Sequence, residues 1–271
     1  MEKIVSLQNS RVKKWASLHQ KKYRDMYGLF LVEGDHLIGE AEEAGVLEAL
    51  IFDEPCSRYC ENMFEVTPQI MKRLSANVSD VHMIGVCRKK DQVSESAKRA
   101  VLLDGVQDPG NLGTIIRTAK SFSFDAVYCS PDCCDLYNEK AIRSTQGALF
   151  HIPVIRTDLA PLIHELKKEG FAVTGTSLQE SCPLSSLQKQ DKMAFVFGSE
   201  GQGVSDKVLE ACTHAVRIEQ YGHIQLRKTD LIQHQENLIT SRSRTANHIF
   251  YPAVYDLTRR FSLFRPFRAP I

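Results

Sequence analysis

Hydrophobic and polar positions follow helix-like or strand-like spacing along most of the chain. In the first part this pattern predicts a basic amphipathic helix over 12–25, a strand and turn over 29–34, a helix over 36–44, a strand over 47–52, a helix over 67–74 and a strand over 83–86. Together these elements predict a small α/β unit covering residues 1–90. The charged, serine-containing stretch over 91–99 is interpreted as a linker.

The second part, residues 100–271, begins abruptly with an apolar strand. Its pattern predicts strands over 101–106, 126–129, 152–155, 171–174, 193–197 and 214–218, alternating with helices over 111–122, 138–150, 159–168 and 207–212. Such alternation predicts an α/β fold with a parallel sheet covered on both faces. Ligands of these sheets bind beyond the carboxyl ends of the strands, so the loops there are the first places to search.

Composition adds little until charge is followed along the chain. The 271 residues are 43% hydrophobic and 25% charged, with a net charge of +1, which is ordinary for a globular protein. Seven Lys or Arg residues lie in 1–24 against one acidic residue, which favours a polyanionic partner such as RNA or, alternatively, a solvated charged face. The candidate RNA contacts are Lys13, Lys14, Lys21, Lys22 and Arg24.

Several classes of protein are disfavoured. The eight cysteines match no zinc-binding spacing, so no metal is expected. No apolar run approaches the roughly 20 residues of a membrane span, and the charged start does not resemble a signal peptide. We therefore expect a cytoplasmic protein with reduced thiols.

Two loops carry the candidate chemistry. The first follows the strand over 101–106, and Asn111 is predicted to cap the helix that comes next, on which Arg117 has the reach to bind a phosphate or carboxylate. The second, Phe197 to Gly203, places three glycines and Glu200 directly after an apolar strand. Taken singly, an ordinary surface arginine and a plain turn remain alternative interpretations.

Together the two loops are more specific. Asn-Leu-Gly-Thr-Ile-Ile-Arg-Thr-Ala over 111–119 and Phe-Gly-Ser-Glu-Gly-Gln-Gly over 197–203 resemble motifs one and two of the SpoU/TrmH-type RNA 2'-O-methyltransferases of the SPOUT superfamily. The segment over 141–154 is similar to the stretch between those motifs. Leu-Val-Glu-Gly over 31–34 resembles the opening of the family's small ribosomal-protein-L30e-like substrate-binding domain.

The resemblance implies a sheet whose C-terminal segment threads a deep trefoil knot, a homodimer, and S-adenosylmethionine as cofactor. It implies catalytic or positioning roles for Arg117, Asn111 and Glu200, and cofactor contacts near Thr176, Gly198, Gly201 and Ile218. It also implies that Arg143 binds RNA phosphate or braces the site. Because guanidinium stays protonated, electrostatic stabilisation of a developing alkoxide suits Arg117 better than a role as base. Ribosomal RNA is favoured over transfer RNA by analogy with the small domain.

The chain departs from the family after Ile218. The third motif normally ends a strand in Ile-Pro-Met, followed by Gly and a Ser-Leu-Asn that opens an apolar helix. Here Gly222 and His223 fit, but Arg227 and Lys228 stand near the expected Leu and Asn, and the remaining tail is rich in Gln, Ser, Thr and Arg. Three explanations are open: translation out of the original frame, a divergent RNA-binding end, or a fold that has lost catalysis.

Two competing functions follow from these observations. A non-catalytic RNA-binding protein would keep the fold without a complete cofactor site. A nicotinamide-dependent dehydrogenase is disfavoured, because the glycine spacing over 198–203 is wrong and the loop comes too late in the sheet.

Overall fold

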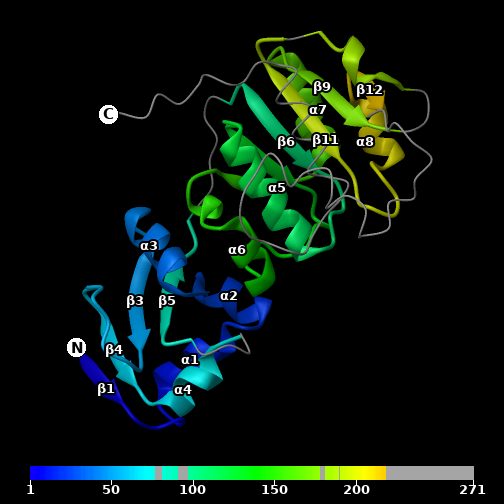
Figure 1. The fold of residues 1–271 in the computed structure, drawn as a ribbon. Helices are drawn as coiled ribbons and strands as arrows, with labels where there is room; N and C mark the ends of the chain where they lie inside the picture. The colour runs from blue at the N-terminus through cyan, green and yellow to red at the C-terminus, as the bar shows by residue number, and fades with distance from the viewer. Residues whose placement is uncertain (77–80, 91–96, 178–180, 189, 218–271) are drawn as a thin grey trace, which may run out of the picture.

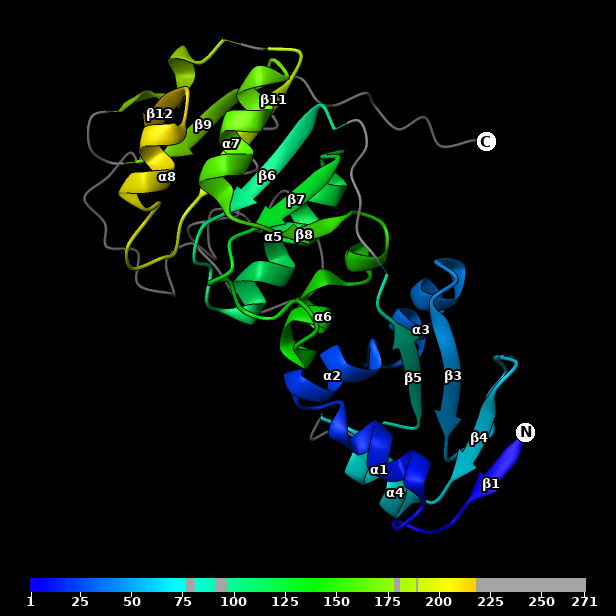
Figure 2. The ribbon, with the colours of Figure 1, turned by 180° about the vertical axis from the view of Figure 1, so that it is seen from behind.

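The computed structural model describes residues 1–76, 81–90, 97–177, 181–188 and 190–217. Two α/β units follow one another along the chain, the first coloured blue to cyan and the second green to yellow in Figures 1 and 2. The predicted trefoil knot and the third-motif segment, including Ile218, lie outside the described residues. Most of the predicted linker over 91–99 does too, and its last residue, Arg99, already opens a strand.

The N-terminal unit is a mixed sheet with helices on both faces. Within the described residues the strand order is β1-β4-β3-β5-β2, with β5 antiparallel to its neighbours β2 and β3. The elements are β1 Glu2–Ile4, α1 Ser10–Ser17, α2 Lys21–Tyr27, β2 Leu29–Glu33, α3 Asp35–Glu43, β3 Leu47–Phe52, β4 Met63–Val66, α4 Pro68–Leu74 and β5 Met83–Arg88.

The C-terminal unit contains a sheet in which every described strand pair is parallel, in the order β10-β12-β9-β11-β6-β7-β8. The elements are β6 Arg99–Leu103, α5 Pro109–Ser121, β7 Ala126–Cys129, α6 Glu139–Thr145, the 3-10 turn Ala148–Phe150, β8 Val154–Arg156, α7 Leu159–Lys168, β9 Ala172–Thr176, β10 Cys182–Pro183, the 3-10 turn Leu184–Ser186, β11 Met193–Phe197, α8 Asp206–Ala211 and β12 His214–Arg217. The α/β fold class with a parallel sheet, predicted from the sequence, is confirmed.

Side-chain alternation along β6 explains the two layers of helices. Val101 and Leu103 belong to the core that contains Ile115 of α5, whereas Leu102 belongs to the core that contains Ile163 of α7. Because successive side chains of a strand point to opposite faces, one apolar strand needs a helix on each side. The α5 layer faces the N-terminal unit, and α7 and α8 cover the far face (Figures 1 and 2).

The two units share an apolar interface. Phe30 of β2 lies in the same buried cluster as Leu112 of α5 and Ile142 of α6, and its ring centroid is 4.6 Å from that of Tyr137. Arg24 reaches across to Asp135 at 2.6 Å. Burial of apolar side chains from both units means that the relative position of the units is held by a core as well as by surface contacts.

Two predicted helices are interrupted, and each interruption serves the interface. The helix predicted over 12–25 is split into α1 and α2, and the carbonyl groups of Leu18 and His19 in the break accept hydrogen bonds from Arg24 at 2.8 Å. The helix predicted over 138–150 stops at Thr145, because the next two residues are left-handed: Gln146 has a φ of +49° and Gly147 a φ of +89°. A Cβ at Gly147 would lie 2.6 Å from the side chain of Glu40, so glycine at this position lets the N-terminal unit pack closely against the C-terminal unit.

Candidate functional site

The helix of the first motif begins earlier than the sequence predicts. Asp108, not Asn111, caps α5: its carboxylate accepts a hydrogen bond from the backbone N–H of Asn111 at 2.9 Å, and Pro109 occupies the first turn. Burial raises the pKa of Asp108, but hydrogen bonds from Lys140 and the Asn111 backbone outweigh it, so the pKa is lowered. The prediction of Asn111 as the cap is wrong, and its side chain is free for another contact.

That contact joins the two motif loops. Asn111 is 3% exposed, and its Nδ2 donates a hydrogen bond to Oε1 of Glu200, 89 residues further along the chain. The other end of the amide, Oδ1, is buried and has no hydrogen-bond partner among the described residues. A buried acceptor without a partner is costly unless a donor meets it, and a ribose hydroxyl or an amine of a bound ligand is such a donor.

The loop after β11 is a narrow turn built by its glycines. Ser199 and Gly203 exchange backbone hydrogen bonds of 3.1 and 2.9 Å, and Gly203 has a φ of +72°. A Cβ at Gly198 would lie 1.8 Å from the carbonyl carbon of Gly203, so only glycine permits the turn to close. The tip of the turn, with Glu200 and Gly201, is left exposed beyond the sheet.

Asp104, which is not among the predicted site residues, fixes this turn to the sheet. Its carboxylate accepts a hydrogen bond from the backbone N–H of Ser205 at 2.8 Å, and its own N–H donates to the Phe197 carbonyl. The signal that points to it is its position directly after the central strand β6. The ends of β6 and β11 are thereby held together.

The predicted cofactor contacts fall on neighbouring strand ends. Thr176 ends β9 and donates its hydroxyl to the Val196 carbonyl at 3.1 Å, and Gly198 follows β11 directly. Since β9 pairs with both β11 and β12, the ends of three adjacent parallel strands meet at one edge. This is the edge at which such sheets bind nucleotides and related ligands. Ile218, the remaining predicted contact, lies outside the described residues.

Arg117 lies on α5, two turns beyond the Asn111 contact. Its side chain is half-buried, and the structure describes no hydrogen bond or ion pair between its guanidinium and the described residues. Ile115 and Ile116 beside it are buried in the interface core. A fixed helix with an uncommitted guanidinium suits an anionic ligand, and the catalytic role of Arg117 stays a prediction.

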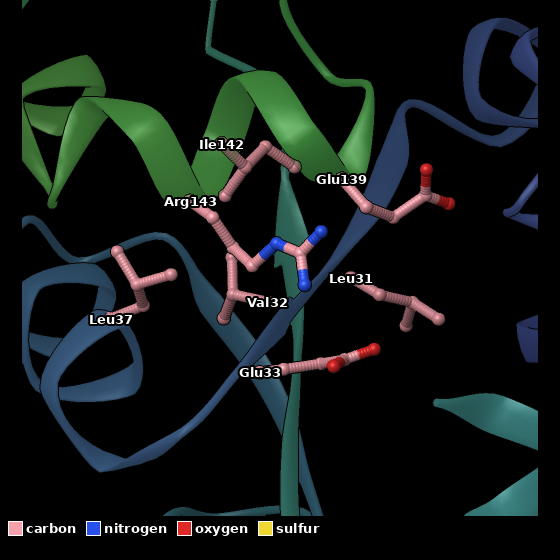
Figure 3. Close-up of a pocket in the computed structure, with 7 residues that line it drawn as sticks. All are labelled: Leu31, Val32, Glu33, Leu37, Glu139, Ile142 and Arg143. Carbon is pink, nitrogen blue, oxygen red and sulfur yellow. The ribbon is translucent and has the colours of Figure 1, made fainter. Parts of the chain in front are cut away.

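Arg143 faces the N-terminal unit. It lines a pocket between the units together with Leu31, Val32, Glu33, Leu37, Glu139 and Ile142. Figure 3 shows its guanidinium pointing into this pocket, between the carboxylates of Glu139 and Glu33. Arg143 is exposed, and both roles that the resemblance implies, bracing of the site and contact with RNA phosphate, stay predictions.

The predicted RNA contacts separate into two groups. Arg24 is 4% exposed and donates to Asp135 and to two backbone carbonyls, so its predicted contact with RNA is corrected to a structural role in the interface. Lys21 is exposed and pairs with Asp25 at 2.5 Å. Lys13 and Lys22 are exposed, and Lys14 is half-buried; none of the three forms an ion pair with a described residue. Charge along a sequence does not reveal which cations a distant carboxylate will neutralise.

Comparisons with known proteins agree with these motifs. The profile of the SpoU rRNA Methylase family matches residues 98–225, and that of the MRM3-like substrate binding domain matches residues 9–85. The chain is 36% identical over 230 residues to the 23S rRNA (guanosine(2553)-2'-O)-methyltransferase RlmP of Bacillus subtilis, covering 82% of this chain and 92% of that one.

Solved structures give the same result. An rRNA methyltransferase from Sinorhizobium meliloti is 26% identical with a TM-score of 0.71, over 80% of this chain and 89% of that one. The SpoU methyltransferase AviRb from Streptomyces viridochromogenes, in complex with AdoMet, has the same fold, with a TM-score of 0.73 at 22% identity over 81% of this chain and 92% of that one.

No helix among the described residues is long and apolar enough to cross a membrane. The close relative, the two family profiles and the shared fold all point the same way. The resemblance drawn from the two motif loops is confirmed: the chain belongs to the SpoU rRNA Methylase family, a family of RNA 2'-O-ribose methyltransferases.

Proposed function

We propose that this chain transfers a methyl group from S-adenosylmethionine to a ribose 2'-hydroxyl of ribosomal RNA. The observation that carries the proposal is the hydrogen bond between Asn111 and Glu200, which ties the two motif loops together at the carboxyl edge of the sheet. The relative from Bacillus subtilis, which methylates a guanosine of 23S rRNA, supports ribosomal RNA as the substrate class.

The described residues fit the cofactor. Backbone groups at Thr176, Gly198 and Gly201, at or after the ends of β9 and β11, would bind the cofactor at this edge of the sheet, together with Ile218. The unpartnered Oδ1 of Asn111 offers an acceptor to a hydroxyl or amine. When bound, S-adenosylmethionine supplies an electrophilic methyl group; no metal is needed for that chemistry.

The side chains of the chain itself prepare the nucleophile. A ribose hydroxyl is a poor nucleophile, so alignment and stabilisation of its developing negative charge account for much of the acceleration. Arg117 would stabilise that charge, because a guanidinium remains protonated and cannot serve as a base. Asn111 and Glu200 would position the ribose and hold the two loops in register.

The resemblance further supports a homodimer in which one subunit contributes to the site of the other, and a cytoplasmic location with the RNA. The departure after Ile218 supports the competing candidate, an RNA-binding protein without turnover. The segment that would cover the cofactor has Arg227 and Lys228 where the family has uncharged residues, and the family profile ends at residue 225.

One experiment separates the two candidates. S-adenosylmethionine and S-adenosylhomocysteine are titrated into the purified chain by calorimetry, and transfer of a labelled methyl group to unmodified ribosomal RNA is then measured. The proposal expects micromolar binding of both ligands and incorporation into ribose. Folded protein that binds RNA but neither ligand would establish the non-catalytic alternative.

The role of Arg117 is tested separately. Arg117→Ala is compared with Lys120→Ala, which removes an exposed cation from the same helix. We expect methyl transfer by Arg117→Ala to fall by roughly 100-fold or more, the scale of losing one electrostatic stabiliser, with cofactor binding unchanged. Full methyl transfer by Arg117→Ala would remove Arg117 from the mechanism.

A further inference from the structure

Two tyrosines, Tyr23 half-buried and Tyr27 exposed, form a pair on the short helix α2. Tyr23 and Tyr27 lie one turn apart, with ring centroids separated by 6.3 Å and ring planes only 16° from parallel. Tyr27 is 40% exposed and its neighbour Met26 is 61% exposed, so this side of α2 faces outward among the described residues. Neither tyrosine hydroxyl has a hydrogen-bond partner in the described part of the chain.

Two lysines are associated with the same rings. Lys14 of α1 places its ammonium 4.9 Å from the ring centroid of Tyr27, and Lys22 places its ammonium 5.7 Å from that of Tyr23. A cation over an aromatic face is stabilised by the charge distribution of the ring. The four side chains therefore form one surface of aromatic faces and positive charge, here called the tyrosine platform.

Local carboxylates do not neutralise this surface. Asp25 is the one acidic residue between Ser10 and Tyr27, and it binds Lys21 at 2.5 Å and Lys89 at 2.6 Å. Lys13, Lys14 and Lys22 are left without an ion pair in the described structure. An exposed cationic surface with near-parallel rings is complementary to a polyanion that carries flat bases.

The chemistry selects single-stranded RNA over a duplex. Bases in an A-form helix are stacked on one another, whereas unpaired bases can stack on tyrosine rings while lysines contact the adjoining phosphates. The platform also lies next to the C-terminal unit. Arg24 of the same helix forms a hydrogen bond with Asp135, and His19 forms one with Glu139 at the start of α6. Figure 1 shows α2 beside α6, at the junction of the two units.

We propose that the tyrosine platform binds an unpaired base of the RNA substrate, with Lys14 and Lys22 contacting the phosphates beside it. The proposal rests on the proposed function, because it takes the bound polyanion to be the RNA that is methylated. It assigns the N-terminal unit a preference for substrates that present a loop or a single-stranded end next to the target nucleotide.

The test uses the full chain and a short single-stranded RNA that carries the fluorescent base 2-aminopurine, compared with the same strand annealed into a duplex. Wild-type protein is expected to bind the single strand more tightly and to quench its fluorescence by stacking. The paired substitution Tyr23→Leu and Tyr27→Leu is expected to weaken binding by about tenfold or more and to abolish the quenching. Tyr59→Leu, at a tyrosine that is 80% exposed in the same unit, is the matched control and should bind normally.

The lysines are tested through salt dependence. Lys14→Gln with Lys22→Gln should reduce the slope of log affinity against log salt by about 0.7 for each phosphate that the variant no longer neutralises, whereas the tyrosine variant should keep the wild-type slope. All these side chains are at least partly exposed, and thermal unfolding checks that each variant is folded.

Three results would overturn the platform: equal affinity for the duplex, unchanged quenching in the tyrosine variant, or the same loss of affinity in Tyr59→Leu. None of these needs cofactor or turnover. The platform can therefore fail this test in a protein that still methylates ribosomal RNA. It can equally pass the test in a protein that shows no methyl transfer, so the two proposals are tested separately.

Discussion

Arg24 donates a hydrogen bond to Asp135 at 2.6 Å across the interface of the two units, with side chains that are 4% and 17% exposed. Removing one partner of such a buried pair leaves the other charge uncompensated, and this typically costs about 3–5 kcal/mol. We expect Arg24→Met to lower the free energy of unfolding by that order in urea denaturation. Lys3→Ala, which breaks the exposed pair with Glu65, should change it by less than about 1 kcal/mol. Equal losses in the two variants would show that Arg24 does not hold the interface.

Gly113 tests the packing of α5 on α6. In an open helix, Gly→Ala stabilises by about 0.5–1 kcal/mol. Here a Cβ would lie 2.5 Å from the Ala141 carbonyl oxygen and equally close to the Cβ of Ser144, so the helices would have to separate. We expect Gly113→Ala to lower the free energy of unfolding by about 1–3 kcal/mol. A rise in melting temperature would contradict the close contact.

The link between the motif loops is tested at Glu200. Glu200→Gln keeps an acceptor for Asn111 Nδ2, whereas Glu200→Leu removes it. We expect kcat/KM for methyl transfer to ribosomal RNA to fall by roughly 100-fold in Glu200→Leu, the effect of a misplaced reacting group, and by much less in Glu200→Gln. Glu210→Leu, on the exposed side of α8, serves as the control. Equal activity in both Glu200 variants would separate the hydrogen bond from catalysis.

The contact between His19 and Glu139 predicts a pH dependence of stability. The hydrogen bond with Glu139 at 3.0 Å raises the pKa of His19 above its ordinary 6.5, against the opposing effect of burial. A raised pKa stabilises the folded state fully below 6.5, and this stabilisation is lost as pH rises through the folded value. Burial raises the pKa of Glu139, but the bond to His19 outweighs it and lowers the pKa below 4.5, so its contribution is lost in acid.

The contribution of the pair should therefore be greatest between about pH 4.5 and 6.5. Unfolding of the wild type and of His19→Gln is compared at pH 6 and pH 9. We expect the stability difference between the two proteins to be larger at pH 6. A difference that does not change with pH would mean that His19 stays neutral in the folded protein.

The sequence predicts regular elements well where one periodicity dominates. The strands at Met193–Phe197 and Ala126–Cys129 lie where the apolar runs predict them. The helix predicted over 138–150 ends at Thr145, where Gln146 and Gly147 adopt left-handed conformations, and Gly147 there lies against the side chain of Glu40, about a hundred residues away in the sequence. Local pattern has no access to such a contact.

In the candidate site, too, the sequence predicts what local residues determine and misses what distant contacts determine. Glycine spacing and the apolar strand before it indicate the turn over 198–203, since a steric need for glycine is written in the local sequence. The local sequence does not reveal the role of Arg24, because a run of basic residues predicts an exposed surface unless Asp135 is known to lie beside Arg24. Asp104 was missed for a related reason: its partner is a backbone N–H 101 residues later.

The strand order also bears on synthesis of the protein. β11 lies between β6 and β9 in the sheet, yet it follows β9 in the chain. When the chain has left the ribosome only as far as β9, β11 is still missing. The edge of β6 is then open, and no strand joins β9 to β6. Open strand edges promote association with other chains. The N-terminal unit is complete once Arg88 has emerged, and domains generally fold as units during synthesis. The unit proposed to bind RNA is thus able to fold over a hundred residues before Phe197 completes β11, the strand that joins β9 to β6 in the C-terminal unit.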